Sequence, residues 1–152
     1  MNIYMDVSCL NRPFDDQRQA RIRLEAEAVT VILQQLDAGR WRQISSEMAE
    51  IEIAAVTDSE RRRRIAALLP VPHDRMRLSA SMFRRAAKPG RLGFKPADAL
   101  HVAAAEAGGA DVLLTCDDRL CRLAARRAAR LSVRLANPLT WLKEQADASN
   151  PG

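Results

Sequence analysis

The stretch "KPADALHVAAAEAGGADVLLTCDDRL" (residues 95–120) decides the fold, because it places a helix, a short strand and a second helix in immediate succession. Pro96 suits the first turn of a helix, where a missing backbone N–H costs nothing. The alanine-rich helix that begins there ends at Gly108-Gly109. The apolar run at 111–116 is typical of a strand. Strands that alternate with helices form right-handed crossovers within a largely parallel sheet.

The same alternation continues on both sides of this stretch. Strands are predicted at 2–7, 41–44, 111–116 and 132–136, with a weak candidate at 71–78. Helices are predicted at 16–38, 47–56, 57–70, 79–87, 97–107, 118–130 and after Pro138. The third begins at a Thr57–Glu60 capping box and ends at Pro70, and the fourth stops at a Pro89-Gly90 turn. Residues 8–14 are predicted to form a Pro-containing turn. The sequence therefore predicts a single domain over residues 1–152, with an α/β fold. We expect a three-layer α/β/α sandwich around a central, mainly parallel sheet of four to five strands.

The composition is that of a soluble globular protein. Apolar residues make up 47% of the chain and charged residues 28%, and no run approaches the roughly 18 apolar residues of a membrane span. The first residues lack a basic-then-apolar signal, so we expect a cytoplasmic protein that does not bind membranes. A net charge of +5 favours an anionic partner such as nucleic acid, although the arginine run at 61–64 is also typical of a solvated helix face.

The three cysteines, Cys9, Cys116 and Cys121, match neither a disulfide framework nor a zinc site. We interpret them as small buried apolar residues. With only two histidines in the chain, a bound metal is expected to have oxygen ligands.

Acidic residues follow two of the predicted strands. Asp6 ends the first strand, and Asp117 comes directly after the strand at 111–116. Ligands of open α/β sheets bind outside the carboxyl ends of the strands, where the strand order reverses. If these two strands are neighbours, both carboxylates point into one crevice. Asp98 lies in the first turn of its helix, where an acid is favoured with or without a functional role.

The helix at 47–56 offers a further acid. Glu47 fits the first turn and needs no other role, whereas Glu50 and Glu52 cannot share one face of a helix. Met48, Ile51 and Ala55 recur at the spacing of a buried face, which lies beside Glu52. We therefore prefer Glu52 as the site residue and keep Glu50 as the alternative.

Carboxylates that converge in one crevice raise one another's pKa and destabilise the fold unless a cation neutralises them. Mg²⁺ and Mn²⁺ are hard ions that prefer carboxylate oxygens and water, and pairs of such ions promote phosphodiester cleavage. The pattern of acids therefore predicts a divalent metal site that acts on a phosphate substrate.

Three blocks of the sequence together resemble the PIN-domain family, which includes the VapC-type toxins of bacterial toxin–antitoxin systems. They are "MNIYMDVSCLNRPFDD" (1–16), "ISSEMAEIEI" (44–53) and the stretch at 95–120. In that family a strand-end D-x-S/T, a helix Glu, a helix-start Asp and a T-x-D after a strand form an acidic metal site. The matching positions here are Asp6 with Ser8, Glu52 (or Glu50), Asp98, and Thr115 with Asp117.

The resemblance implies an endoribonuclease that depends on Mg²⁺ or Mn²⁺, with RNA as substrate, a protein antitoxin as partner and a homodimeric state. Asp6, Asp98 and Asp117 would hold the metal, and Glu52 would complete its shell or orient the attacking water. Ser8 and Thr115 would hydrogen-bond a carboxylate or the scissile phosphate, and Arg12 would contact phosphate. His101 is expected to be a packing residue.

Two other classes of protein remain as alternatives. A non-catalytic RNA- or protein-binding module would use the acids only as helix caps and the helix at 16–38 as an interface. A phosphoacceptor receiver domain also collects acids and Mg²⁺ at strand ends, but it needs its Lys-Pro pair at the end of the last strand. Lys95-Pro96 instead opens the helix before the strand at 111–116.

Overall fold

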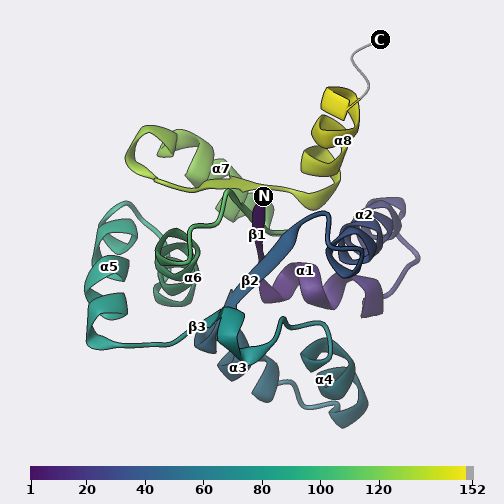
Figure 1. The fold of residues 1–152 in the computed structure, drawn as a ribbon, viewed down its shortest axis with the longest axis horizontal. Helices are drawn as coiled ribbons and strands as arrows, with labels where there is room; N and C mark the ends of the chain where they lie inside the picture. Colours follow the sequence, from purple (N-terminus) through teal and green to yellow (C-terminus); the bar gives the residue numbers. More distant parts are fainter. Residues whose placement is uncertain (150–152) are drawn as a thin grey trace.

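The computed structural model describes residues 1–149, in which five parallel strands form one sheet with helices on both faces (Figure 1). The strands are β1 (Asn2–Met5), β2 (Arg42–Ser46), β3 (Arg75–Met76), β4 (Val112–Leu114) and β5 (Arg134–Ala136). Their order is β3-β2-β1-β4-β5, and every neighbouring pair is parallel. The predicted α/β fold with a parallel sheet is confirmed, and the weak candidate at 71–78 contains the two-residue strand β3.

Helices cover the sheet from both sides, and all of them except α1 lie where the sequence predicts a helix. They are α1 (Val7–Asn11), α2 (Ala20–Asp37), α3 (Glu47–Ala54), α4 (Ser59–Ala66), α5 (Ala80–Arg91), α6 (Pro96–Ala107), α7 (Asp118–Arg126) and α8 (Pro138–Ser149), with short 3₁₀ turns at Arg12–Phe14, Pro72–Asp74 and Ala128–Arg130. Helices α5, α6 and α7 lie on one side of the sheet, and α1, α2, α4 and α8 lie on the other (Figure 1). None of the helices within residues 1–149 has the length and apolar character needed to cross a membrane.

One helix was missed and one predicted helix start was wrong, because in each case a local cap was overlooked. The segment at 8–14 contains the expected Pro-containing turn only at Arg12–Phe14: Asp6 accepts a hydrogen bond from the backbone N–H of Cys9, and this cap starts α1 at Val7. The cap of α4 is Asp58 rather than Thr57, since its carboxylate accepts from the N–H groups of Glu60 and Arg61, both at 3.0 Å. Aspartate is one of the most effective N-cap residues, so a neighbouring threonine does not displace it.

The lengths of three helices also differ from the prediction. Helix α2 begins at Ala20 rather than at residue 16. Helix α5 continues through Pro89 to Arg91 and stops at Gly93, whose φ of +106° is left-handed. Pro89 is tolerated because it lies in the last turn, where its ring disturbs one carbonyl of a helix that is about to end. The long basic helix expected at 118–130 is α7 followed by a separate 3₁₀ turn.

The core has two halves, one on each face of the sheet, and the alternation of β1 divides them. Ile3 and Met5 pack toward α1, α2 and α8 with Leu10, Val29, Ile32 and Trp141. Tyr4 points to the opposite face, where it joins Ile44, Leu113 and the alanine side of α6. The small side chains of α6 let this helix approach the sheet closely. Where the helix ends, Gly108 leaves no room for a side chain, because an added Cβ would lie only 2.9 Å from Ile44 Cγ2.

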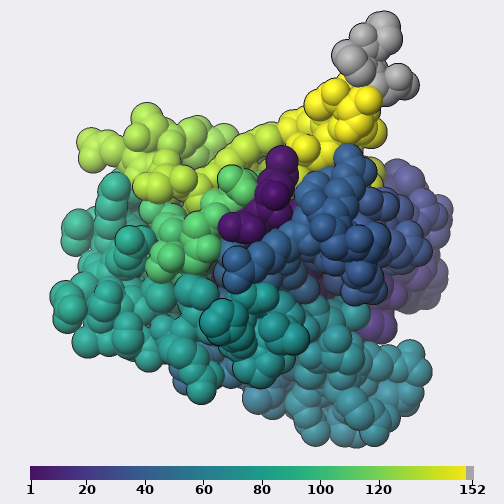
Figure 2. All heavy atoms as spheres, viewed as in Figure 1, coloured from purple at the N-terminus to yellow at the C-terminus, as the bar shows by residue number. Residues whose placement is uncertain are grey.

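The chain reaches solvent just before the central strand, since Met1 is exposed and Asn2 is half-buried. In the space-filling view the N-terminal residues (purple) emerge between the segments coloured blue and green (Figure 2). The opposite end of β1 leads to Asp6, which is buried. Cys9 and Cys116 are buried as expected, with sulfur atoms 3.8 Å apart, and Cys121 is half-buried.

Candidate functional site

The carboxyl ends of β1 and β4 lie side by side, which places Asp6 close to the loop that carries Thr115 and Asp117. Met5 of β1 is in register with Leu114 of β4, and the N–H of Asp6 donates to the Leu114 carbonyl at 3.0 Å. The chain crosses from β1 to β2 and β3 on one side and later to β4 and β5 on the other. The strand order therefore reverses at this point, which is where α/β sheets bind ligands.

Asp6 is held firmly in place. Its Oδ1 accepts from Ser8 Oγ at 2.5 Å and from the Cys9 N–H at 3.0 Å, and the residue is only 7% exposed. Burial raises the pKa of Asp6, and the hydrogen bonds from Ser8 and Thr115 offset part of that rise. The carboxylate is thus fixed by two donors while its environment still disfavours a lone negative charge.

Ser8 and Thr115 join the loops after β1 and β4. Ser8 Oγ accepts from the Cys116 N–H at 3.0 Å and lies 3.3 Å from Thr115 Oγ1. Thr115 Oγ1 in turn accepts from the Asp117 N–H at 3.1 Å. Both hydroxyls therefore position the two aspartates, and a contact of either hydroxyl with phosphate stays a prediction.

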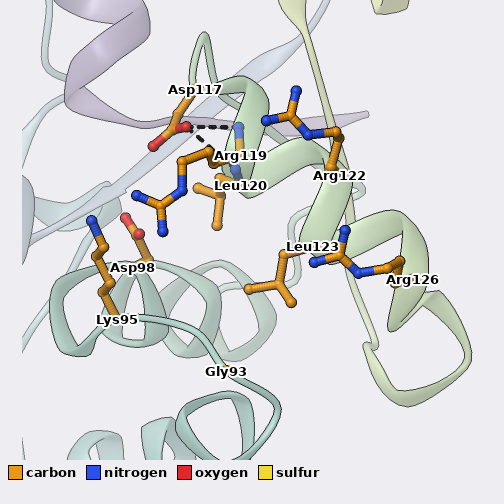
Figure 3. Close-up of a pocket in the computed structure, with 9 residues that line it drawn as sticks. All are labelled: Gly93, Lys95, Asp98, Asp117, Arg119, Leu120, Arg122, Leu123 and Arg126. Carbon is orange, nitrogen blue, oxygen red and sulfur yellow. Dashed lines mark hydrogen bonds between the residues drawn. The ribbon is translucent and has the colours of Figure 1, made fainter.

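Asp98 and Asp117 face each other across a hollow between α6 and α7 (Figure 3). Asp117 caps α7 by accepting from the N–H groups of Arg119 at 2.9 Å and Leu120 at 3.3 Å. Asp98 is half-buried, and no group within residues 1–149 donates a hydrogen bond to its carboxylate. Burial raises the pKa of Asp98, the charges of Asp6, Asp117 and Glu52 raise it further, and His101 acts in the opposite direction.

Glu52, and not Glu50, faces this cluster of acids. Its carboxylate is hydrogen-bonded to Nε2 of His101, whereas Glu50 forms ion pairs with Arg75 at 3.0 Å and Arg77 at 3.7 Å. The expected buried face of α3 was wrong: Ile51 is 49% exposed, and Ala49 and Ile53 are buried instead. Two isoleucines two residues apart made the face ambiguous, but Glu52 still lies at its edge.

A buried chain of hydrogen bonds leads to Glu52, and it could not be foreseen from the sequence. The Tyr4 hydroxyl lies 2.7 Å from Ser46 Oγ and 2.6 Å from His101 Nδ1, and all three residues are buried. One assignment of the hydrogen positions gives every donor in this chain of hydrogen bonds an acceptor. The Ala49 N–H donates to Ser46, Ser46 donates to Tyr4 and Tyr4 donates to His101 Nδ1, so the Nε2–H of His101 donates to Glu52. Burial raises the pKa of Tyr4 well above its usual value and keeps its proton in place.

His101 is therefore buried, as expected of a packing residue, but both ring nitrogens are engaged in positioning an acid. The available signal was a tyrosine in the middle of a buried strand, because a buried hydroxyl needs a partner. Nothing in the sequence identified that partner, since His101 lies 97 positions away.

Arg12 is drawn toward the interior. Its guanidinium forms ion pairs with Asp15 at 3.1 Å and with Glu25 at 3.1 Å, and Glu25 is only 1% exposed. A phosphate would have to compete with two carboxylates for this side chain. The contact of Arg12 with phosphate stays a prediction, and its evident task here is to neutralise a buried glutamate.

The donor set fits a hydrated magnesium ion better than a tightly enclosed one. Within residues 1–149, no three Asp, Glu, His or Cys side chains converge closely enough to form a ready metal-binding group. Mg²⁺ is commonly held by one or two carboxylates and keeps several water ligands. Asp98 accepts no hydrogen bond within residues 1–149, so its carboxylate oxygens are available to such an ion, and the neighbouring acids are close enough to contribute through water ligands.

Comparison with known proteins identifies the family. Residues 3–126 match the family model of the PIN domain. Among solved structures, VapBC2 from Rickettsia felis bound to a promoter DNA fragment is similar with a TM-score of 0.58 and 14% identity, covering 90% of this chain and 98% of that chain. FitAcB from Neisseria gonorrhoeae has a TM-score of 0.55 and 17% identity over 90% and 97% of the two chains. FitAB bound to an IR36 DNA fragment has a TM-score of 0.54 and 16% identity over 90% and 95%.

These identities are low enough that the solved structures show a shared fold and nothing finer. No curated protein sequence matches the chain. The family model, by contrast, spans most of the sequence, from β1 to the end of α7. The chain therefore belongs to the PIN domain family.

Proposed function

We propose that this protein is a metal-dependent endoribonuclease that hydrolyses RNA phosphodiester bonds. The observation that carries the proposal is that Asp6, Glu52 and Asp117 lie close enough to Asp98, at the switch point of the sheet, for their charges to raise the pKa of its carboxyl. Acids brought together in this way cost stability, and a bound cation would remove that cost. Membership of the PIN domain family supports a nuclease.

Asp6, Asp98 and Asp117 are the residues that would hold Mg²⁺ or Mn²⁺. When bound, the metal would lower the pKa of a water ligand and stabilise the charge that develops on the phosphate oxygens. Ser8 and Thr115 keep Asp6 and the Asp117 loop at a fixed separation, and the N–H groups of α7 keep the Asp117 carboxylate oriented.

Glu52 is the acid best placed to handle a proton. His101 donates to one carboxylate oxygen, which leaves the other free to accept from an attacking water. Because the imidazole is itself fixed by Tyr4, the carboxylate does not have to be ordered when substrate arrives. His101 is in this view a positioning residue, and Glu52 is the candidate general base.

The proposal extends to partners. The names of the solved neighbours, VapBC2 and FitAB, are those of two-component complexes, which supports a protein antitoxin as a partner of this chain. The resemblance to VapC-type toxins also leads us to propose a cytoplasmic homodimer.

The second candidate function is a non-catalytic binding module. Two of the acids, Asp6 and Asp117, do cap helices, as that alternative requires. Asp98 and Glu52 do not, because Asp98 has no donor within residues 1–149 and Glu52 is bound to His101 in the middle of α3. Asp98 does lie in the first turn of α6, where an acid is favoured without a functional role, so the binding module accounts for three of the acids and the nuclease for all four.

Cleavage of RNA by the purified protein tests the proposal. A panel of single-stranded and structured RNAs would be incubated with Mg²⁺, Mn²⁺ or EDTA, and compared for wild type, Asp6→Asn, Asp98→Asn and the matched control Asp37→Asn. Asp37 is exposed at the end of α2, far along the chain from the acids. We expect metal-dependent cleavage by wild type and the control, and none by the other two.

Two outcomes would contradict the proposal. Cleavage that survives both Asp6→Asn and Asp98→Asn would indicate a contaminating nuclease. A wild type that neither cleaves RNA nor releases heat on titration with Mg²⁺ or Mn²⁺ would favour the binding module.

A further inference from the structure

A cationic groove opens directly from the candidate metal site. It is a hollow of about 280 Å³ between the start of α6 and the outer face of α7 (Figure 3). Its lining residues are Gly93, Lys95, Asp98, Asp117, Arg119, Leu120, Arg122, Leu123 and Arg126. We call this hollow the α7 groove. The lining thus contains four cations and two of the acids, Asp98 and Asp117, which lie at one end of the groove.

The arginines of the α7 groove form a row. Arg119, Arg122 and Arg126 are separated by three and four residues, so they share one face of α7. At 1.5 Å per residue the row is about 10 Å long. Lys95 stands on the opposite wall, at the residue before α6, beside Asp98 (Figure 3). The row begins next to Asp117 and leads away from the acids.

These cations differ from many of the chain's other arginines in lacking a carboxylate partner. Arg21 is paired with Asp118, and Arg134 is paired with Glu144 at 2.6 Å. By contrast, the four cations of the α7 groove form no ion pair within residues 1–149. All four are exposed: Lys95, Arg119, Arg122 and Arg126. A cluster of uncompensated cations of this kind attracts a polyanion.

We infer that the α7 groove binds the backbone phosphates of a single RNA strand on one side of the bond to be cleaved. The inference rests on the proposed function, because the acids fix where that bond lies. A row of about 10 Å spans roughly two or three successive phosphates of one strand. Leu123 and Gly93 supply an apolar floor that suits a sugar, and the lining contains no aromatic ring on which a base could stack. The groove therefore holds the strand by its backbone and reads little of its sequence.

RNA binding without cleavage provides the test. The probe is a fluorescent single-stranded RNA of 12 nucleotides and mixed sequence, measured by anisotropy in EDTA at several salt concentrations. The variant is Arg122→Gln/Arg126→Gln. The matched control is Arg63→Gln/Lys143→Gln, which removes the same charge from exposed positions on α4 and α8.

We expect the Arg122→Gln/Arg126→Gln variant to bind RNA about tenfold more weakly than wild type at 0.1 M salt, with a salt slope reduced by about 1.4. The control should bind within about twofold of wild type. In metal-dependent cleavage the same variant should raise KM with little change in kcat, because it loses binding common to ground and transition states.

The outcomes separate this inference from the nuclease proposal. If wild type cleaves RNA but the groove variant and the control bind alike, the nuclease stands and the inference is wrong. If a 12-base-pair DNA duplex binds more tightly than the RNA and shows the same loss in the variant, the assignment to single-stranded RNA is wrong. A wild type with no metal-dependent cleavage would overturn the proposed function, on which the inference rests.

Discussion

The buried hydrogen-bond chain behind Glu52 can be broken by the loss of a single oxygen atom. Tyr4→Phe removes the hydroxyl that links Ser46 to His101, and it leaves the ring packed between β1 and α6. No cavity is created beyond that one atom, so the change in stability reports the hydrogen bonds alone. The Tyr4 ring also meets the imidazole edge-to-face with centroids 5.7 Å apart, and phenylalanine keeps that contact.

The expected cost follows from the burial of the partners. Two hydrogen bonds of 2.7 and 2.6 Å are lost. Each is worth about 1 kcal/mol, and a buried group left without a partner costs about 1–3 kcal/mol. Ser46 still accepts from the Ala49 N–H, but its own hydroxyl loses its acceptor and His101 Nδ1 loses its donor. We therefore expect the free energy of unfolding to fall by about 2–4 kcal/mol. For a domain of this size each kcal/mol corresponds to about 2–4 °C in Tm.

Urea unfolding of wild type and Tyr4→Phe measures this cost, with Thr30→Val as a control. Thr30 also carries a hydrogen-bonded hydroxyl, but on the exposed side of α2, where its donation to Ala26 is local. The control should change the free energy of unfolding by less than about 0.5 kcal/mol. Metal-dependent cleavage should also fall in Tyr4→Phe, because an imidazole free to turn no longer fixes Glu52. The chain of donors would be refuted if Tyr4→Phe lost less stability than the control, or if it cleaved RNA at the wild-type rate.

Three further predictions concern individual acids. Because the pKa of Asp98 is raised in the folded state, the folded protein binds this proton more tightly than the unfolded chain does; without metal, Asp98→Asn should therefore be more stable than wild type at neutral pH, and this difference should shrink as the pH falls through the raised pKa, as measured by thermal melts in EDTA. Glu52→Gln should slow metal-dependent cleavage about 10²-fold or more, while Glu50→Gln, which loses only ion pairs to arginines, should stay within a few-fold. Glu25→Ala should lower the free energy of unfolding in urea by about 1–3 kcal/mol, because it leaves the Arg12 guanidinium with Asp15 alone and the Asn137 amide without its acceptor.

General rules applied to the sequence were sufficient to predict where the strands lie and that two acids follow them at one edge of the sheet. Asp6 and Asp117 each follow an apolar strand, and parallel strands bring their carboxyl ends to one edge of the sheet. That the two strands are neighbours was an assumption until the register of Met5 with Leu114 was seen. Pro96 located the start of α6 and hence Asp98, because a proline at the first helical position is a strong local signal.

Features that depend on contacts distant in sequence could not be predicted. The face of α3 is set by its packing against the rest of the core, and its two isoleucines gave no preference between Ile51 and Ile53. The end of α5 is set by Gly93 rather than by Pro89, since a proline in a final turn does little harm. The link from Ser46 through Tyr4 to His101 requires β2, β1 and α6 to be in place together.

The acids of the site are stabilised unequally, and that difference indicates how the site works. Asp6 and Asp117 accept hydrogen bonds from backbone N–H groups at the starts of α1 and α7, so the protein itself partly satisfies their charges. Glu52 has His101, but the carboxylate of Asp98 accepts no hydrogen bond within residues 1–149, and the charges of three neighbouring acids oppose it, with His101 acting in the other direction. Asp98 also borders the α7 groove, where Lys95 and Arg119 are the nearest cations along its wall (Figure 3). A phosphate backbone drawn in by those cations would be repelled at Asp98 until a divalent ion neutralised it. Binding of metal and binding of RNA should therefore favour each other, with Asp98 as the residue that couples them.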